Sequence, residues 1–270
     1  MIIGGREFDL DNKCYVMGIL NVTPDSFSDG GKWDKPEIAL LHAQYMCECG
    51  ADIIDVGGES SRPGHESISV QEELDRAIPV IEAIKSRIDI PISIDTCKSV
   101  VAKAAISAGA DLVNDIWGLK SDPKMAAVIA QAGLPCCLMH NRADMDYKDF
   151  IPDLLEDLKQ SVVLAEKSGI EFDKIILDPG IGFAKTHEMN LEAINKIDVI
   201  KGLGCPVLLG ASRKRVIGNT LDLPVEERVE GSVSAAVVGM IRGCAFVRVH
   251  DVKETFRALK MADAIVKSGK

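Results

Sequence analysis

Length, composition and charge suggest a globular protein and exclude several classes of function. The 270 residues are 47% hydrophobic and carry a net charge of −10, which is typical of a folded protein and unlike a general nucleic-acid or anionic-membrane binder. The N-terminus lacks the basic and apolar regions of a secretory signal, and no apolar stretch is long enough to span a bilayer. We therefore expect a cytoplasmic protein.

Short apolar segments alternate with amphipathic segments along the whole chain. Eight of them predict strands covered on both faces, because each is almost continuously apolar: 14–20, 52–56, 91–94, 111–113, 135–139, 174–177, 206–209 and 245–249. Eight strand–helix units without a linker predict one α/β domain over residues 1–270, a single (β/α)8 TIM barrel with a short N-terminal hairpin at its bottom. A doubly wound open sheet is the alternative.

Helix boundaries can also be read from the sequence. Four glycines just before predicted strands indicate helix C-termini: Gly50, Gly109, Gly133 and Gly169. Asp251 and Glu254 predict a capping box, and Ser121 with Pro123 predicts another helix start. Pro79 predicts a kink or break in the helix that contains it.

The eight cysteines predict small buried side chains and no disulfide or zinc site. No CxxC pair occurs, and Cys136 and Cys137 are adjacent in a predicted strand. Without a secretory signal, a disulfide framework is not expected, and free cysteine packs as a small hydrophobic residue.

Polar residues follow every predicted strand. Asp95 illustrates the pattern, since it ends an apolar run and is followed at once by a helical segment. A single such carboxylate could be a helix N-cap. In a barrel, however, all strand ends meet at one rim, where these enzymes carry their active sites. Caps alone do not require Arg, Lys and His, so the pattern predicts an active site.

The charged and polar residues near this rim form two groups by chemistry. The cationic group, which suits phosphate or pyrophosphate, is Arg62, Lys214, Arg248 and His250. The acceptor-rich group, which suits a flat heterocycle with several N–H donors or an electron-poor carbon that passes through a cationic state, is Asp95, Asn114 and Asp178. The predicted ligand is a phosphorylated or pyrophosphorylated heterocycle.

The segment after the first predicted strand, "NVTPDSFSDGGKW", is rich in Ser, Asp and Gly. It is too long for a plain connection. With Gly30 and Gly31 as a hinge and Phe27 at its centre, it predicts a lid that closes over the substrate. A surface loop without such a role is the alternative.

Several motifs together resemble those of the dihydropteroate synthase family. They run in order from residue 17 to residue 252: "MGILNVTPDSFSDGG", "GADIIDVGGESSRPG", "SIDTCK", "VNDIWG", "LDPGIGFAK", "GASRKRVIG" and "RVHDV". The resemblance implies the barrel fold and a reaction that joins 4-aminobenzoate to 6-hydroxymethyl-7,8-dihydropterin diphosphate, with release of pyrophosphate. It also implies a homodimer, with no nucleic-acid or membrane partner.

The resemblance also implies roles for individual residues. The pterin residues would be Asp95, Asn114, Met139, Asp178, Phe183 and Lys214, of which Asp95, Asp178 and Lys214 are the expected catalytic residues. The pyrophosphate residues would be Asn21, Arg62, Arg248 and His250. The 4-aminobenzoate residues would be Phe27, Ser61, Pro63 and Ser212, and Mg²⁺ would bind at Asn21 and Asp29.

Two rival functions remain open at this point. One is a methyltetrahydrofolate–corrinoid methyltransferase, which resembles this family in its barrel and pterin site but uses no pyrophosphate site. The other is a non-catalytic pterin-binding protein. The residues Arg62, Arg248 and His250 argue against the first, and the intact lid segment and Mg²⁺ residues argue against the second.

Overall fold

Eight parallel strands form the centre of the computed structural model, which describes residues 1–23, 35–60 and 67–268. Each strand is a short apolar run near a predicted position. In chain order they are β3 (Tyr15–Asn21), β4 (Ile53–Gly57), β5 (Ile92–Asp95), β6 (Leu112–Asp115), β7 (Cys136–Met139), β8 (Ile175–Asp178), β9 (Leu208–Leu209) and β10 (Phe246–Val249).

The order of the strands shows that the sheet closes on itself. It runs β8-β7-β6-β5-β4-β3-β10-β9, with every neighbouring pair parallel. A parallel bridge between Leu177 and Val207 then joins β8 to the segment leading into β9. The predicted (β/α)8 barrel is confirmed, and the open doubly wound sheet is excluded.

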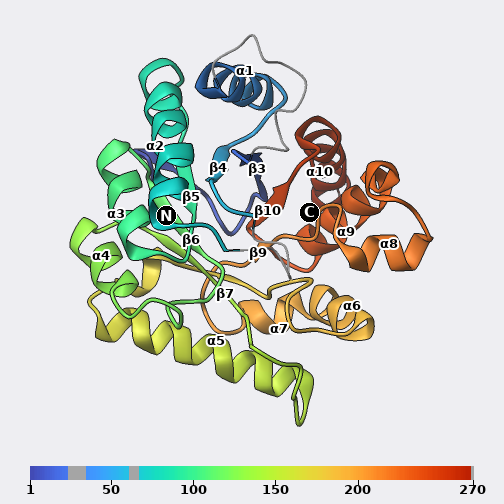
Figure 1. The fold of residues 1–270 in the computed structure, drawn as a ribbon. Coiled ribbons are helices and arrows are strands. Elements are labelled where there is room, and N and C mark those ends of the chain that lie inside the picture. The colour runs from blue at the N-terminus through green and yellow to red at the C-terminus, as the bar shows by residue number, and fades with distance from the viewer. Residues whose placement is uncertain (24–34, 61–66, 269–270) are drawn as a thin grey trace.

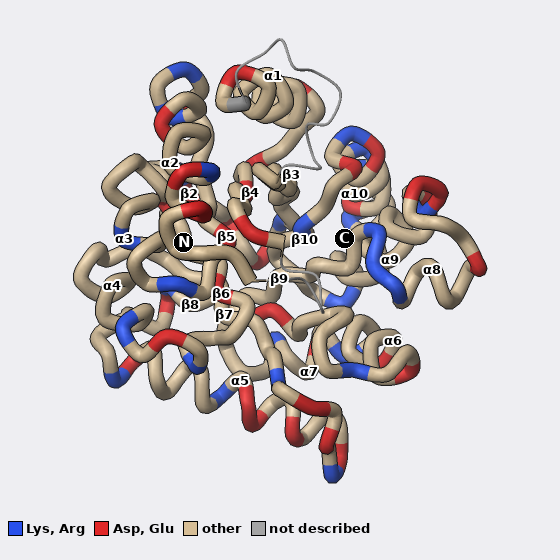
Figure 2. Tube along the Cα trace, viewed as in Figure 1, with Lys and Arg blue, Asp and Glu red and all other residues tan. Residues whose placement is uncertain are grey.

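Helices surround the barrel and cover the outer faces of its strands (Figure 1). Their bounds are α1 (Lys35–Glu48), α2 (Val70–Arg87), α3 (Ser99–Ala108), α4 (Met125–Ala132), α5 (Phe150–Lys167), α6 (His187–Asn195), α7 (Ile197–Lys201), α8 (Arg215–Leu221), α9 (Val229–Ile241) and α10 (Val252–Lys267). The described residues also form the 3₁₀ turns η2 (Phe172–Lys174) and η3 (Val225–Glu227). Lys, Arg, Asp and Glu are interspersed over these outer helices (Figure 2).

The glycines predicted to end helices adopt the left-handed conformation expected of them. Gly109 caps α3 with φ 111° and Gly133 caps α4 with φ 66°. Gly50 and Gly169 follow α1 and α5 with φ 104° and 94°. This region of backbone space is open to glycine at little free-energy cost, so these four boundaries are confirmed.

The predicted helix starts are less accurate. The carboxylate of Asp251 binds Arg213, at 2.5 and 2.9 Å, and makes no capping bond to α10. The carboxylate of Asp122 accepts bonds from the backbone of Lys124, one residue before α4, and of Ser99, the first residue of α3. The predicted capping box is therefore wrong, and so is the helix start at Ser121–Pro123.

The helix α2 runs without a break from Val70 to Arg87, with Pro79 inside it. The predicted break at Pro79 is therefore excluded, and the alternative, a kink at this residue, stays a prediction. Ser69 caps the helix, because its hydroxyl accepts a bond from the Glu72 backbone at 3.1 Å. The apolar side chains of Val80, Ile81 and Ile84 are buried, and this packing supports the helix beyond the proline.

The N-terminal hairpin is formed by β1 (Ile2–Ile3) and β2 (Arg6–Glu7), as predicted. It brings Ile3 and Phe8 into an apolar cluster with inward-facing strand residues, including Tyr15 and Phe246. The Phe8 ring lies 4.7 Å from that of Tyr15 and 5.9 Å from that of Phe246, between ring centres. These contacts are at the N-terminal ends of the strands, so the hairpin seals the bottom of the barrel.

Candidate active site

Predicted polar residues converge at the C-terminal ends of the strands. Arg248 of β10 connects two neighbouring strands, because its Nε donates to Asp55 of β4 at 2.6 Å and its Nη2 donates to Asp95 of β5 at 2.7 Å. Asn114 of β6 lies beside them, with its Nδ2 3.4 Å from Asp55 Oδ2. The predicted cationic and acceptor-rich groups are therefore interleaved in space.

Asp55 is a site residue that the sequence analysis missed. Its side chain is fully buried, and its Oδ1 makes no hydrogen bond within the described part of the chain. A carboxylate at this depth needs a cation, and Arg248 supplies one. The available signal was the charge itself inside the apolar run "IIDVG".

A second part of the site lies between β8 and the segment after β9. A Cβ on Gly210 would be 3.5 Å from Asp178 Oδ2, 3.8 Å from Lys214 Nζ and 3.9 Å from Arg248 Cβ, so the three side chains meet around this glycine. Lys214 Nζ also donates to the Ile181 carbonyl at 2.6 Å and lies 4.8 Å from the Phe183 ring centre.

Burial changes the proton affinities of these groups. It raises the pKa of Asp95 to about 7, against the attraction of Arg248. It also raises the pKa of Asp178 above its usual value, against the attraction of Lys214. Burial lowers the pKa of Lys214 to about 8, against the attraction of Asp178. Perturbed groups of this kind are concentrated at functional sites.

The remaining described site residues surround this centre. Met139 and Phe183 are buried apolar side chains, at the end of β7 and in the turn after β8. His250 follows β10, and both its backbone nitrogen and its Nδ1 lie within 3.2 Å of Ser212 Oγ. Asn21 ends β3, and a Cβ on Gly57 would be 3.5 Å from Asn21 Oδ1.

Asp95 is not the N-cap of the helix that follows it. That helix, α3, begins at Ser99, and its N-cap residue Lys98 makes no side-chain capping bond. The Asp95 carboxylate binds Arg248 instead. The charge at the end of "SID" is therefore paired with Arg248 at the rim of the barrel and does not cap the helix.

Five predicted site residues lie outside the described part of the chain: Phe27, Asp29, Ser61, Arg62 and Pro63. The predicted lid lies there too, apart from its first residues. The described residues on either side of 61–66 are joined, since Ile68 N donates to Glu59 at 3.2 Å. Lys98 Nζ donates to Glu59, to Glu73 and to the Ile68 carbonyl, at 2.5, 2.7 and 2.9 Å.

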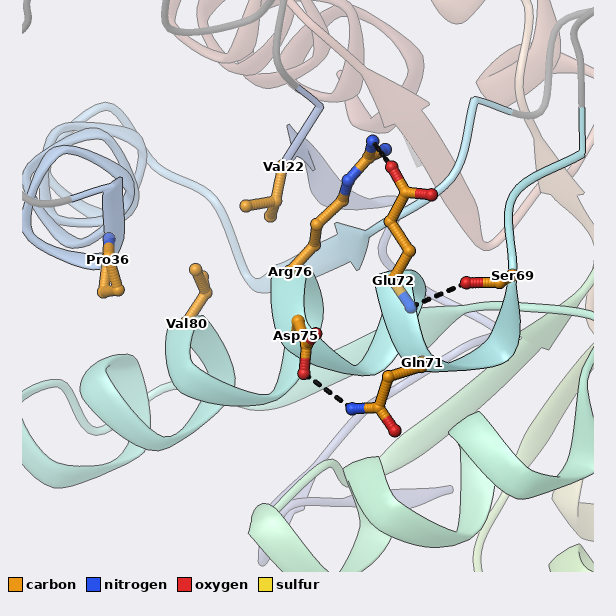
Figure 3. Close-up of a pocket in the computed structure, with 8 residues that line it drawn as sticks. All are labelled: Val22, Pro36, Ser69, Gln71, Glu72, Asp75, Arg76 and Val80. Carbon is orange, nitrogen blue, oxygen red and sulfur yellow. Dashed lines mark hydrogen bonds and ion pairs between the residues drawn. The ribbon is translucent and has the colours of Figure 1, made fainter.

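A separate cavity of about 410 Å³ lies between α1, α2 and Val22, the residue directly after β3 (Figure 3). Its lining includes Val22, Pro36 and Ser69, which border the two internal segments outside the described residues. The strand-end residues around Asp95 and Lys214 are not part of its lining. We therefore base the candidate site on the convergent side chains.

The described residues contain neither a metal-holding cluster nor a membrane-spanning helix. Within them, no group of three or more His, Cys, Asp or Glu is placed to hold a metal ion. None of the helices described is both long and apolar enough to cross a bilayer. All eight cysteines are free, and four are buried as predicted: Cys136, Cys137, Cys205 and Cys244. The other four are only half-buried, so the prediction of burial is wrong for Cys14, Cys47, Cys49 and Cys97.

The arrangement can bind a flat polar ring. Asp95 and Asp178 provide acceptors for N–H groups, Asn114 provides both an acceptor and donors, and Lys214 provides a cation. The barrel and this strand-end site are those of an enzyme that holds a nitrogen heterocycle. Consistently, residues 17–250 match the family model described as "Pterin binding enzyme".

Comparison with individual proteins defines the family more closely. The dihydropteroate synthase of Clostridium beijerinckii is 56% identical over 268 residues, which are 99% of this chain and 100% of the relative. The dihydropteroate synthase of Clostridium difficile, solved in the presence of pteroic acid, matches with a TM-score of 0.94 and 48% identity, over 97% of this chain and 100% of that one.

A third comparison agrees with these two. The Xanthomonas albilineans dihydropteroate synthase, solved with 4-aminobenzoic acid, matches with a TM-score of 0.94 and 41% identity, over 98% of this chain and 97% of that one. The chain belongs to the dihydropteroate synthase family. As a member it is a pterin-binding transferase of folate biosynthesis, which confirms the family predicted from the motifs.

Proposed function

We propose that the chain joins 4-aminobenzoate to 6-hydroxymethyl-7,8-dihydropterin diphosphate, releasing pyrophosphate and forming 7,8-dihydropteroate. The observation that carries this proposal is the cluster of Asp95, Asn114, Asp178, Lys214 and Arg248 in a chain so similar to a dihydropteroate synthase. Solved relatives that hold pteroic acid and 4-aminobenzoic acid support both halves of the substrate assignment.

The pterin ring would bind among the groups that converge on Gly210 and Arg248. Asp95, Asp178 and Asn114 would accept hydrogen bonds from its N–H groups, and Lys214 would donate to a ring acceptor. Met139 and Phe183 would pack against the ring and exclude water. In this site Asp95, Asp178 and Lys214 are the proposed catalytic residues.

The reaction would be a dissociative substitution at the methylene carbon. The C–O bond to the diphosphate breaks, and the leaving oxygen keeps the electron pair. The positive charge left on the methylene carbon is delocalised into the pterin. The ionised Asp95 would stabilise this charge, because electrostatic interactions with a fixed group are strong where water is excluded. The aniline nitrogen then forms the C–N bond and loses a proton to solvent. A neutral arylamine needs little help from a base.

The diphosphate would lie near Asn21, Arg62, Arg248 and His250. Arg248 can form charge-assisted hydrogen bonds to phosphoryl oxygens. Asn21 would offer an amide oxygen to a Mg²⁺ ion there, since its Oδ1 stands at the end of β3, 3.5 Å from a Cβ on Gly57. Mg²⁺ is often held by one or two protein oxygens together with substrate phosphates. Asn21 and Asp29 would hold the ion, which supplies positive charge to the leaving group.

The 4-aminobenzoate would bind beside the pterin, toward Ser212. The proposed residues are Phe27, Ser61, Pro63 and Ser212, of which only Ser212 is in the described part of the chain. Its hydroxyl bonds the backbone nitrogen of His250 at 3.2 Å. This contact would couple the arylamine side of the site to the diphosphate side.

The decisive experiment is a turnover assay. Purified protein receives the dihydropterin diphosphate and Mg²⁺, with and without 4-aminobenzoate, while pyrophosphate and dihydropteroate are both measured. We expect equal amounts of the two products when 4-aminobenzoate is present. Tight pterin binding without turnover would contradict the proposal and favour a methyltransferase or a non-catalytic pterin-binding protein.

Two conservative variants separate the proposed roles. Asp95→Asn keeps the shape but removes the charge, so we expect kcat to fall on the order of 100-fold, as for loss of one preorganised electrostatic group. Arg248→Lys keeps a cation without the planar fork. It should raise KM for the diphosphate substrate by a larger factor than the Kd of 6-hydroxymethylpterin, which lacks the diphosphate. Wild-type kinetics in both variants would refute the site assignment.

We further propose that the protein is a cytoplasmic homodimer in which residues 1–270 form one domain. Support for the dimer comes from large exposed apolar side chains on the adjacent helices α9 and α10: Val238, Ile241, Met261 and Ile265. Sedimentation equilibrium should give the mass of two chains, and Ile241→Glu should give one. A wild-type mass of one chain at assay concentration would contradict this proposal.

A further inference from the structure

The turn after β8 lies between two lysines. It spans residues 179–184, and its backbone has positive φ at Gly180, Gly182 and Ala184, at 70°, 88° and 43°. A left-handed conformation is unfavourable for alanine by roughly 1–2 kcal/mol. A turn of this shape needs fixed contacts to hold it, and they come from both sides.

On the inner side, the turn contacts the proposed pterin site. Lys214 Nζ donates to the Ile181 carbonyl at 2.6 Å and faces the Phe183 ring. Asp178 Oδ1 accepts a bond from the Gly180 nitrogen at 2.7 Å. The conformation of this turn therefore sets where Phe183 and the Lys214 ammonium stand.

On the outer side, Lys185 holds the same turn. Its side chain is buried, and its Nζ lies 3.1 Å from the Gly180 carbonyl, 3.1 Å from the Phe183 carbonyl and 2.8 Å from His140 Nδ1. An ammonium has three donors, so these three acceptors satisfy all of them. Lys185 was not among the predicted site residues.

His140, which ends the β7 segment, gives Lys185 a fixed partner. Burial and the nearby Lys185 lower the pKa of His140 to about 3, so its ring is neutral. Its Nε2 lies 3.0 Å from Asp157 Oδ2, which also accepts a bond from Arg142 at 2.5 Å. The ring therefore donates from Nε2 to the carboxylate and accepts at Nδ1 from Lys185.

We propose that Lys185 is a positioning residue for the pterin half of the site. Its ammonium joins His140 to the Gly180 and Phe183 carbonyls and so places the Phe183 ring and the Lys214 ammonium. This role rests on the proposed function, because it assumes that the pterin binds against Lys214 and Phe183. Lys185 acts only through the turn.

The cost of burying the Lys185 charge indicates that this residue contributes to pterin binding and not to the stability of the fold. Burial lowers the pKa of Lys185 to about 7, against the attraction of Asp178. An ammonium in such a position destabilises the folded state relative to an apolar side chain of similar size. Stability alone would favour methionine here, whereas placement of the turn requires three donors.

The test compares Lys185→Met with Lys196→Met, a control at an exposed lysine after α6. For Lys185→Met we expect KM for the dihydropterin diphosphate and Kd for 6-hydroxymethylpterin to rise about tenfold, as for loss of one charge-assisted hydrogen bond. KM for 4-aminobenzoate should change less than twofold. The control should match the wild type in all three quantities.

The outcomes separate this inference from the proposed function. A wild type that forms no dihydropteroate refutes the proposed function. An active wild type with unchanged pterin constants in Lys185→Met refutes only the role of Lys185. Equal increases in KM for both substrates would also refute it, since a general loss of structure would explain them.

A measurement on the wild type keeps the inference testable if the variant does not fold. Long-range ¹H–¹⁵N NMR distinguishes the two nitrogens of the His140 ring. We expect the proton on Nε2 and a hydrogen-bonded, unprotonated Nδ1. A proton on Nδ1 would overturn the inference, because Lys185 could not then donate to His140.

Discussion

At the scale of residues, Asp95 and Lys214 predict the pH dependence of catalysis. Asp95 acts as a carboxylate with a pKa of about 7, so activity should fall as the pH drops below it. Lys214 acts as an ammonium with a pKa of about 8, so activity should fall as the pH rises above it. We expect kcat/KM for the dihydropterin diphosphate to be bell-shaped, since this quantity reports the free enzyme.

Lys214→Arg provides the control for this profile. Arginine stays protonated throughout the accessible range, so the contribution of Lys214 to the alkaline limb should disappear. The acidic limb and the contribution of Lys185, whose pKa burial lowers to about 7, should remain. The absolute rate should fall, because the longer planar group misplaces its donors. An alkaline limb that persists unchanged would mean that another group causes it.

The same scale shows what the sequence could reveal about the site. Asp95, Asn114, Asp178, Lys214 and Arg248 were identified because each stands near a strand end, and closure of the barrel brings such ends together. Asp55 was missed because it stands inside an apolar strand, where the run was read as uniformly apolar. The pair of Lys185 and His140 depends on contacts 45 residues apart, which no local pattern indicates.

At the scale of elements, Gly50 and Gly133 predict two different effects of one substitution. A Cβ on Gly50 would stand 2.5 Å from the Phe256 ring, and φ there is 104°. Gly50→Ala should therefore lower the free energy of unfolding by about 2–4 kcal/mol, through both strain and overpacking. Gly133 has φ 66° and nothing within 4 Å of a Cβ, so Gly133→Ala should lower it by about 1 kcal/mol.

Urea denaturation of both variants measures this difference. Equal losses of stability would show that contact with Phe256 contributes nothing and that backbone strain accounts for the whole effect. Similar dihydropteroate formation in both folded variants is expected, because Gly50 and Gly133 lie before β4 and β7 and not at the C-terminal rim.

Element boundaries show where sequence reasoning works and where it does not. The helix C-termini predicted from glycines were correct, because a positive φ is a property of the local backbone. The predicted capping box failed because the Asp251 carboxylate has a stronger partner in Arg213, 38 residues away. The partner of a side-chain oxygen depends on tertiary contacts, so its capping role is not a local property.

At the scale of the whole molecule, the bottom apolar cluster and the candidate active site lie at opposite ends of the barrel. Phe8 packs in the bottom cluster and is 4% exposed. Phe8→Ala should reduce the free energy of unfolding by about 3–5 kcal/mol, as for other large-to-small core substitutions. The KM values should stay near wild type at a temperature where the variant is folded, since the catalytic rim is at the other end.

Denaturant unfolding and steady-state kinetics of the same preparation test this separation. A large rise in the pterin KM without loss of stability would show that the two ends are coupled. The overall barrel could be predicted because eight apolar strands with short connections leave few alternatives. The residues that make the closing contact between β8 and the segment leading into β9 could not be predicted, because β9 has only two residues.

The pairing of Arg248 with two carboxylates affects how strongly the site can bind free inorganic anions. Its guanidinium is occupied by Asp55 and Asp95, so a free phosphate must compete with two fixed negative groups to reach it. A pterin that engages Asp95 reduces that competition for the diphosphate attached to it. We therefore expect free inorganic phosphate to bind Arg248 weakly. Inhibitors that mimic only the diphosphate should bind more weakly than inhibitors that also carry a pterin-like ring.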